Sequence, residues 1–272
     1  MKATVLALYR VRMPIYLGAA VILIGNALSG AALPPVLPIL ALVAVVFCLA
    51  LVVLGPKLLP VPEPRVVTAP VRGRWLGINS PATKTPSHGI RAYGQAYAID
   101  LVHEPEADTR PQFGVGPALR PNHQYPAFGQ PVLAMIDGEV VKASGWRRDH
   151  RSRSTTAALL YMFAEGMVRE IGGPGFILGN HVVIRGEDGI FAAVAHLQQG
   201  SLKVRVGDRV QAGDQVGSCG NSGNSSEPHV HAQLMDRASP TLAQGLPMAF
   251  AAVTIEADQV DGLPANDQHM SA

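Results

Sequence analysis

The pattern of apolar positions divides the chain into two parts of different character. No charged residue occurs from Met13 to Pro56, a run of 44 residues, whereas about 20 apolar residues suffice for one transmembrane helix. Pro34 and Pro35 interrupt the run, so it predicts two helices, at about residues 14–32 and 36–55, joined by a tight turn. Residues 1–56 are therefore expected to form a membrane-spanning helical hairpin.

Two other interpretations of this run stay open. Lys2, Arg10 and Arg12 resemble the basic start of a signal peptide, with the small residues at 27–32 as its cleavage site. A second apolar stretch would still follow and serve as an anchor. Alternatively, the two segments would form a buried helix pair in a soluble domain.

The charges beside the run bear on membrane orientation. Basic residues lie on both flanks, and a hairpin puts both flanks on the same side of the membrane. They are Lys2, Arg10 and Arg12 before the run and Lys57, Arg65, Arg72 and Arg74 after it. The positive-inside rule favours the cytoplasmic side for these flanks, although large domains translocate largely regardless of charge.

The remaining chain has the pattern of a linker and a β domain. Residues 57–74 are rich in proline, which predicts a semi-rigid linker. From Trp75 onward, short apolar runs alternate with glycine-containing turns, so residues 75–262 predict a mainly β domain with an antiparallel sheet or sandwich-like arrangement. One hairpin is expected from 131–136 and 139–141 around Asp137-Gly138, and a second from 181–184 and 190–197.

Two segments depart from the β pattern. Residues 155–171 place Leu159, Phe163, Met167 and Ile171 at helical spacing, which predicts an inserted helix after the basic segment 147–153. The small and polar residues 263–272 predict a flexible tail.

Composition excludes some classes of function. The chain has 22 basic and 20 acidic residues and a net charge of +2, which gives no electrostatic reason to expect a nucleic acid partner. Its two cysteines, Cys48 in the apolar run and Cys219 in the β domain, indicate no disulfide framework. The sequence leaves the oligomeric state open.

Histidines in strand-like segments are the strongest chemical signal. His229 and His231 stand two residues apart, so in a strand their side chains point the same way about 7 Å apart along the chain. His196 lies in an apolar strand-like run, and His88 and Asp100 occur near the start of the β domain. A catalytic zinc site typically has three protein ligands and leaves the fourth position to water.

These residues stand within an ordered set of motifs that covers roughly residues 75–235. The set includes His88 and Asp100 and then the segments 129–140, 179–184, 195–197, 206–217 and 220–231. In this order it resembles the LytM/lysostaphin-type zinc endopeptidases, which cut peptide cross-links of bacterial cell walls. The resemblance implies that His88, Asp100 and His231 hold zinc and that His196 and His229 are catalytic residues that do not bind it. It does not assign which of these two histidines acts as the general base.

Two positions depart from the family pattern. The usual spacing is His-x-x-x-Asp, whereas His88 and Asp100 are twelve positions apart, so a loop must return the histidine to the metal. Val194 stands where the family often has tyrosine.

The resemblance implies a membrane-anchored zinc metalloendopeptidase whose substrate is peptidoglycan peptides. Such an enzyme must face its substrate, so we expect the C-terminal domain outside the cytoplasmic membrane of a bacterium. One alternative is a catalytically silent relative that binds cell wall or a partner and regulates another hydrolase. Another is a biotinyl or lipoyl carrier domain, but the turn Asp137-Gly138 lacks the lysine that such a domain needs.

Overall fold

The computed structural model describes residues 2–28, 33–58, 61–107 and 109–272, which form two compact units, Met1–Pro62 and Glu63–Ala272. The first unit consists of helices α1 (Lys2–Leu28) and α2 (Val36–Leu58), which pack against each other. Gly55 of α2 lies against the Tyr9 ring, where a Cβ atom would have no room. The predicted pair of apolar helices is therefore confirmed.

The helix bounds differ from the prediction. Helix α1 begins at Lys2 instead of residue 14, because Arg10 and Arg12 do not interrupt a segment of good helix formers and the helix continues through Pro14. Residues 29–32 of the predicted first helix lie outside the described residues. By length and composition, Thr4–Leu28 and Val36–Pro56 are long and apolar enough to cross a membrane. Most of their large apolar side chains are exposed, as on a surface that faces lipid.

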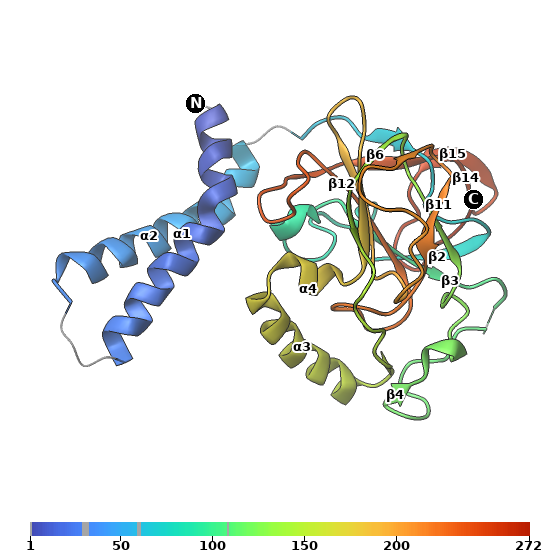
Figure 1. Ribbon diagram of the computed structural model, residues 1–272, viewed down its shortest axis with the longest axis horizontal. Helices are drawn as coiled ribbons and strands as arrows, with labels where there is room; N and C mark the ends of the chain where they lie inside the picture. Colours follow the sequence, from blue (N-terminus) through green and yellow to red (C-terminus); the bar gives the residue numbers. More distant parts are fainter. Residues whose placement is uncertain (1, 29–32, 59–60, 108) are drawn as a thin grey trace. The chain divides into compact units, whose positions relative to one another are not determined.

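The second unit is built around a large, mostly antiparallel sheet (Figure 1). Within the described residues the sheet has twelve strands, in the order β1 (Arg65–Val67), β14 (Met248–Ile255), β16 (His269–Ser271), β2 (Arg74–Ile78), β3 (Ile99–His103), β12 (Val230–Met235), β9 (Phe191–Ala195), β8 (His181–Arg185), β6 (Gly138–Ser144) and β10 (Arg209–Val210), with β13 (Gly245–Leu246) on β12 and β15 (Asp258–Gly262) on β14. Only the pair β1 and β14 is parallel among these. The mainly β fold predicted from the sequence is confirmed.

Two further strand pairs lie outside this sheet. Strand β5 (Pro131–Leu133) pairs with β11 (Gln215–Ser218), and β4 (Leu119–Arg120) pairs with β7 (Ser152–Arg153). The core between the strands is formed by side chains such as Ile99, Leu101 and Val194.

One predicted hairpin is correct and the other is wrong. Strands β8 and β9 pair as expected. Strand β5 does not pair with β6, however, because the amide of Ala134 donates to the Asp214 carbonyl oxygen at 2.8 Å and β6 pairs with β8. The chain bends at 135–137 between the two strands, but distant segments provide the partners of both.

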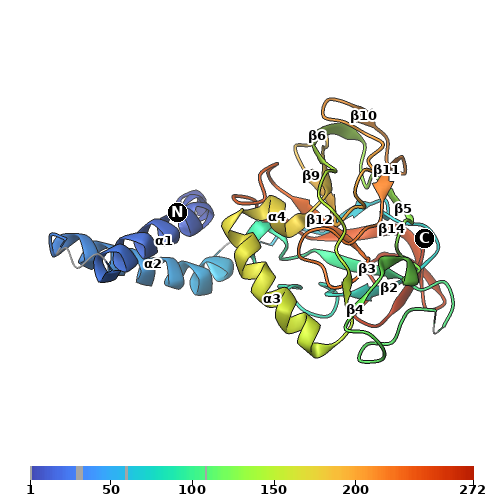
Figure 2. The same ribbon diagram turned by 60° about the horizontal axis from the view of Figure 1, so that its bottom comes forward.

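Helix α3 (Thr156–Ile171) confirms the predicted insertion, and the short helix α4 (Pro174–Leu178) follows it. The Thr155 hydroxyl caps α3 by accepting from the Ala158 amide. Both helices lie together on one side of the second unit (Figure 2).

The predicted linker and tail both contain strands. Strand β1 lies within residues 57–74, and β16 lies within the tail that was expected to be flexible. Residues of β16 pair with β2 on one side and β14 on the other, and Met270, which is 1% exposed, stands opposite Trp75. The prediction of a flexible tail is therefore wrong, because the buried Met270 and the pairing with both neighbouring strands fix this mostly polar segment.

We predict that Met270→Ala lowers the free energy of unfolding of the second unit by about 2–5 kcal/mol, since it leaves a cavity opposite Trp75. Urea unfolding of the full chain in detergent, followed by tryptophan fluorescence, measures this change. Ser271→Ala, at an exposed position of the same strand, serves as the control and is expected to change the free energy by less than about 0.5 kcal/mol. Equal losses from both variants would contradict the prediction.

Candidate metal centre

Four neighbouring strands carry most of the candidate site in a single row. Asp100 of β3 stands opposite Ile78 of β2 on one side and opposite His231 of β12 on the other. His231 in turn stands opposite Ala195 of β9. Asn79 and His196 follow Ile78 and Ala195 directly, so the register of β2, β3, β12 and β9 brings residues from four distant parts of the chain together.

A loop before β3 adds His88 to this row. The Ser87 amide donates to the Ala96 carbonyl oxygen at 3.0 Å, which closes the loop between them. His88 Nε2 then lies 3.1 Å from Asp100 Oδ2. The loop thus accommodates the twelve-position spacing between His88 and Asp100.

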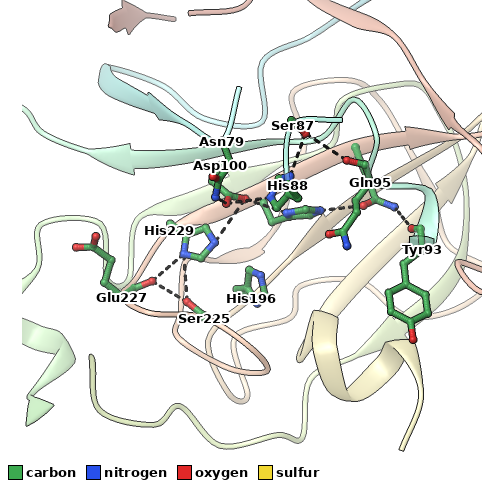
Figure 3. A network of polar contacts seen from close by, with 12 residues as sticks. Asn79, Ser87, His88, Tyr93, Gln95, Asp100, His196, Ser225, Glu227 and His229 are labelled. Carbon is green, nitrogen blue, oxygen red and sulfur yellow. Dashed lines mark hydrogen bonds and ion pairs between the residues drawn. The ribbon is translucent and has the colours of Figure 1, made fainter. Parts of the chain in front are cut away.

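His88, Asp100 and His231 offer three ligand atoms that all lie within 4.8 Å of one another. His231 Nδ1 is 2.8 Å from Asp100 Oδ1, and the Asn79 side-chain amide donates to Asp100 Oδ2 at 2.8 Å. Figure 3 shows His88, Asn79 and His229 gathered around Asp100. Both Asp100 and His231 are buried.

The imidazoles of His88 and His231 each form a hydrogen bond on the side away from Asp100, and this bond determines which ring nitrogen faces the Asp100 carboxylate. The Ser87 hydroxyl donates to the Gln95 carbonyl oxygen, so it accepts from His88 Nδ1 at 3.0 Å. The Gln233 amide nitrogen donates to the Tyr93 carbonyl oxygen, so its Oε1 accepts from His231 Nε2 at 2.8 Å. Each imidazole therefore directs the lone pair of its other nitrogen toward Asp100.

Three electron-pair donors that face one another repel unless a proton or a cation lies between them. Two imidazole nitrogens and one carboxylate are ligands that zinc accepts in a tetrahedral site with one open position. The residues present therefore fit a zinc ion.

His196 and His229 border the same space. His196 Nδ1 donates to the Ser222 carbonyl oxygen and His229 Nδ1 to the Glu227 carbonyl oxygen, both at 2.8 Å. These bonds leave the Nε2 atom of each ring available for proton exchange, and His229 Nε2 lies 3.6 Å from Asp100 Oδ1. The two ring centroids are 4.7 Å apart.

The close packing of these groups shifts their proton affinities. Burial alone would raise the pKa of Asp100, but the imidazoles of His88 and His229 lower it further than burial raises it. Burial lowers the pKa of His229, and the Asp100 carboxylate more than offsets this, so the net shift is upward. Burial and the neighbouring rings of His229 and His231 hold the pKa of His196 well below its usual value.

The histidines open onto a groove of about 600 Å³ whose walls come from several elements. Helix α3 contributes apolar side chains, including Phe163 and Met167, and the loop after β11 contributes Asn224 and Ser226. An open groove beside a possible metal ligand set and two further imidazoles suits a hydrolytic reaction on an extended substrate.

Sequence reasoning missed three residues that support the site. Gln233 had a usable signal, because it stands two positions after His231 and so on the same face of a strand. Asn79 and Tyr93 had none, since their roles depend on left-handed backbone conformations with φ of 48° and 60°. The other five histidines take no part in the metal ligand set found among the described residues: His103, His123, His150, His181 and His269.

Comparison with known proteins agrees with this class of site. Residues 149–242 match the family model described as Peptidase family M23. This part of the chain is therefore similar to Peptidase family M23, and the predicted resemblance to the LytM/lysostaphin type is confirmed. The matched range includes His196, His229 and His231 but begins after His88 and Asp100, the pair with unusual spacing.

Two characterised relatives match part of the chain. The cell division protein DipM of Caulobacter vibrioides is 31% identical over 103 residues, which are 38% of this chain and 16% of DipM. The glycyl-glycine endopeptidase ALE-1 of Staphylococcus capitis is 31% identical over 123 residues, which are 45% of this chain and 26% of ALE-1. The chain thus spans only a minor part of each relative's length.

Among solved structures, the catalytic domain of lysostaphin from Staphylococcus simulans is 23% identical. That alignment covers 55% of this chain and 74% of the lysostaphin chain, with a TM-score of 0.33.

We predict that Gln233→Leu weakens zinc affinity about 10- to 100-fold, because the His231 ring loses the acceptor that orients it. Titration of the full chain against a chromophoric zinc chelator measures the change. Gln233→Glu, which keeps an acceptor oxygen, is expected to retain most of the affinity. Gln215→Leu, at an exposed position on β11, is the matched control, and an equal loss in that variant would argue against a role for Gln233.

Proposed function

We propose that the C-terminal domain is a zinc metalloendopeptidase that hydrolyses peptide cross-links of bacterial peptidoglycan. In this proposal His88, Asp100 and His231 hold the zinc ion. The convergence of their three electron-pair donors in a buried place, each imidazole oriented by an outer hydrogen bond, carries the proposal. Its support from relatives is the match to Peptidase family M23 and the similarity to ALE-1, a glycyl-glycine endopeptidase.

Zinc bound by these residues would polarise the carbonyl group of the scissile peptide bond and lower the pKa of the attacking water. The chain's own residues supply the proton transfers. The Nε2 atom of one histidine, His196 or His229, takes a proton from the water, and the other stabilises the developing oxyanion or protonates the leaving amine. The carbonyl oxygens of Ser222 and Glu227 hold both rings in the orientation that this requires.

The catalytically silent alternative has less support. A domain that only binds cell wall or a partner has no need to retain a metal ligand set and two further histidines. Here all five residues named from the sequence are present, and their side chains border one groove. Zinc binding without turnover on any wall peptide would favour the silent alternative.

We predict that His231→Ala and His229→Ala of the full chain differ in their effects. His231→Ala removes a ligand, so it is expected to lose both the single equivalent of zinc and cleavage of muropeptides. His229→Ala is expected to retain zinc and lose about 100- to 10,000-fold in kcat, the usual contribution of a general acid or base. Elemental analysis and chromatography of muropeptide digests measure the two properties.

His123→Ala changes an exposed histidine outside the ligand set and is the control for both variants. If His231→Ala keeps both zinc and cleavage, the assignment of the metal centre is wrong.

We further propose that α1 and α2 anchor the chain in the cytoplasmic membrane of a bacterium with the C-terminal domain outside. Two helices of sufficient length and apolarity support the anchor. The substrate supports the orientation, because peptidoglycan lies outside that membrane. The basic residues on both flanks of the helices argue for the opposite orientation, so the position of the domain needs a direct test.

We predict that Glu187→Cys in the full chain reacts with a membrane-impermeant maleimide in intact spheroplasts. The Glu187 side chain is 92% exposed, whereas the native Cys48 and Cys219 are buried, so the new thiol gives the signal and the native chain gives the background. Labelling only after the membrane is permeabilised would place the domain in the cytoplasm. That outcome would remove peptidoglycan as the substrate and leave the zinc chemistry possible.

A further inference from the structure

Helix α3 directs its apolar side toward solvent. Leu160, Phe163, Met167, Val168 and Ile171 recur at helical spacing, and they are 65, 62, 71, 68 and 88% exposed. A helix on the surface of a soluble domain has the opposite arrangement, with its apolar stripe on the core. The stripe on α3 is therefore a surface that lacks its partner among the described residues.

Polar contacts hold the helix in this orientation. Glu165, on the inner side of α3, forms ion pairs with Arg153 and with Arg169, the latter at 3.3 Å. Arg169 donates to the Asn224 side-chain oxygen at 3.4 Å, and a Cβ atom on Gly166 would lie 3.1 Å from that same oxygen. The polar side is thus fixed to the body of the domain, and the helix cannot turn its apolar stripe inward without breaking these pairs.

The exposed apolar surface continues beyond α3. The Arg147 guanidinium group stacks on Phe176 of α4, 3.8 Å from the ring centroid, and lies 4.4 Å from the centroid of Trp146. Trp146 is 68% exposed. We call the exposed side chains of Trp146, Phe163, Met167, Val168, Ile171 and Phe176 the apolar ridge. Helices α3 and α4, which carry five of these six residues, lie together on one side of the domain (Figure 2).

The charges around the apolar ridge are basic. Residues 146–178 contain five arginines and three acidic residues, a net charge of +2. Glu165 pairs with Arg153 and Arg169, and Asp149 accepts from the Asn221 and Gln199 amides inside the domain. The charges of this segment that remain outside these contacts are Arg147, Arg148 and Arg151 against Glu170. Arg148 and Arg151 are exposed. Exposed aromatic and aliphatic side chains beside arginines are the chemistry of a surface that lies in the headgroup region of an anionic membrane.

The chain itself keeps this domain close to a membrane. Helix α2 ends at Leu58 and β1 begins at Arg65, and a connection of that length spans at most about 25 Å even when fully extended. If α2 is in a bilayer, the domain cannot leave its surface.

We propose that the apolar ridge inserts into the interfacial layer of a bilayer that contains anionic lipid. This inference rests on the membrane attachment in the proposed function and adds which face of the domain meets the lipid. Phe163 and Met167 belong both to the ridge and to the wall of the groove at the metal centre. Insertion of the ridge would therefore place the mouth of the groove beside the bilayer, so that peptides near the membrane surface are its substrates.

The two tryptophans of the chain allow a direct test. Trp146 is on the ridge, and Trp75 is 1% exposed in the core. The full chain is reconstituted in phosphatidylglycerol vesicles with brominated acyl chains, which quench nearby tryptophan, and Trp146→Phe gives the background from Trp75. Emission of Trp146 is expected to fall at least about twofold relative to vesicles without bromine, and to fall less in brominated phosphatidylcholine.

Matched substitutions connect the quenching to the ridge. Val168→Asp is expected to abolish most of it, because a carboxylate in the ridge opposes both insertion and the anionic surface. Val206→Asp changes a valine that is 60% exposed away from the ridge and is expected to leave the quenching unchanged. Equal effects of the two substitutions would overturn the proposal.

Flotation of the same vesicles after alkaline extraction separates this inference from the anchor. Chains that stay with the vesicles but show no quenching of Trp146 overturn the ridge proposal and leave the anchor standing. Chains that are extracted overturn both. A third outcome is that brominated lipid does not change the emission of Trp146, whereas protein concentration in detergent does. That outcome assigns the ridge to a second copy of the chain, and it also overturns the proposal.

Discussion

The C-terminal domain depends on a carboxylate placed in the middle of a sheet. Asp100 is 6% exposed, and its neighbours Ile99 and Leu101 are fully buried in the core. An isolated ionised carboxylate in such a place costs several kcal/mol, so the polar groups around it must face it. The Asn79 amide donates to it, and the rings of His88, His229 and His231 face it. Because His88 and His231 present lone pairs, a proton or a cation between them and the carboxylate completes the compensation. The strand register and the loop that contains His88 bring these groups to the buried Asp100 carboxylate.

The sequence predicted the elements of the fold better than their pairing. Periodicity identified the helix at 156–171 and the strands on both sides of Asp137-Gly138, because side-chain spacing is a local property. It could not show that β5 pairs with β11, since that partner follows from contacts about eighty positions away in the chain. Met270 illustrates the same limit. A lone methionine among the polar residues 266–271 gives no periodic signal, yet its burial opposite Trp75 accompanies a strand between β2 and β14.

The sequence predicted which residues form the candidate site, because motifs specify residue types. It did not predict how their side chains are oriented, because that depends on the backbone conformation. The resemblance named His88, Asp100, His196, His229 and His231, and all five border one groove. The orientation of His196 depends on its left-handed φ of 60°, a conformation in which residues with a Cβ atom are uncommon. Nothing in the sequence around His196 marks that conformation. The hydrogen bonds of its amide and carbonyl to Leu178 and Gly220 hold it in the folded chain.

The inserted helix is part of the support of the candidate metal centre. Glu170 near the end of α3 accepts from the Tyr93 hydroxyl, and burial followed by this carboxylate raises the pKa of that hydroxyl, so it stays a donor. The Tyr93 carbonyl oxygen accepts from Gln233, and Gln233 accepts from His231. Hydrogen bonds through the side chain and backbone of Tyr93 and the side chain of Gln233 therefore connect α3 to a proposed metal ligand. Polar contacts on its inner side thus fix α3 in the position that exposes its apolar side and places Glu170 against Tyr93.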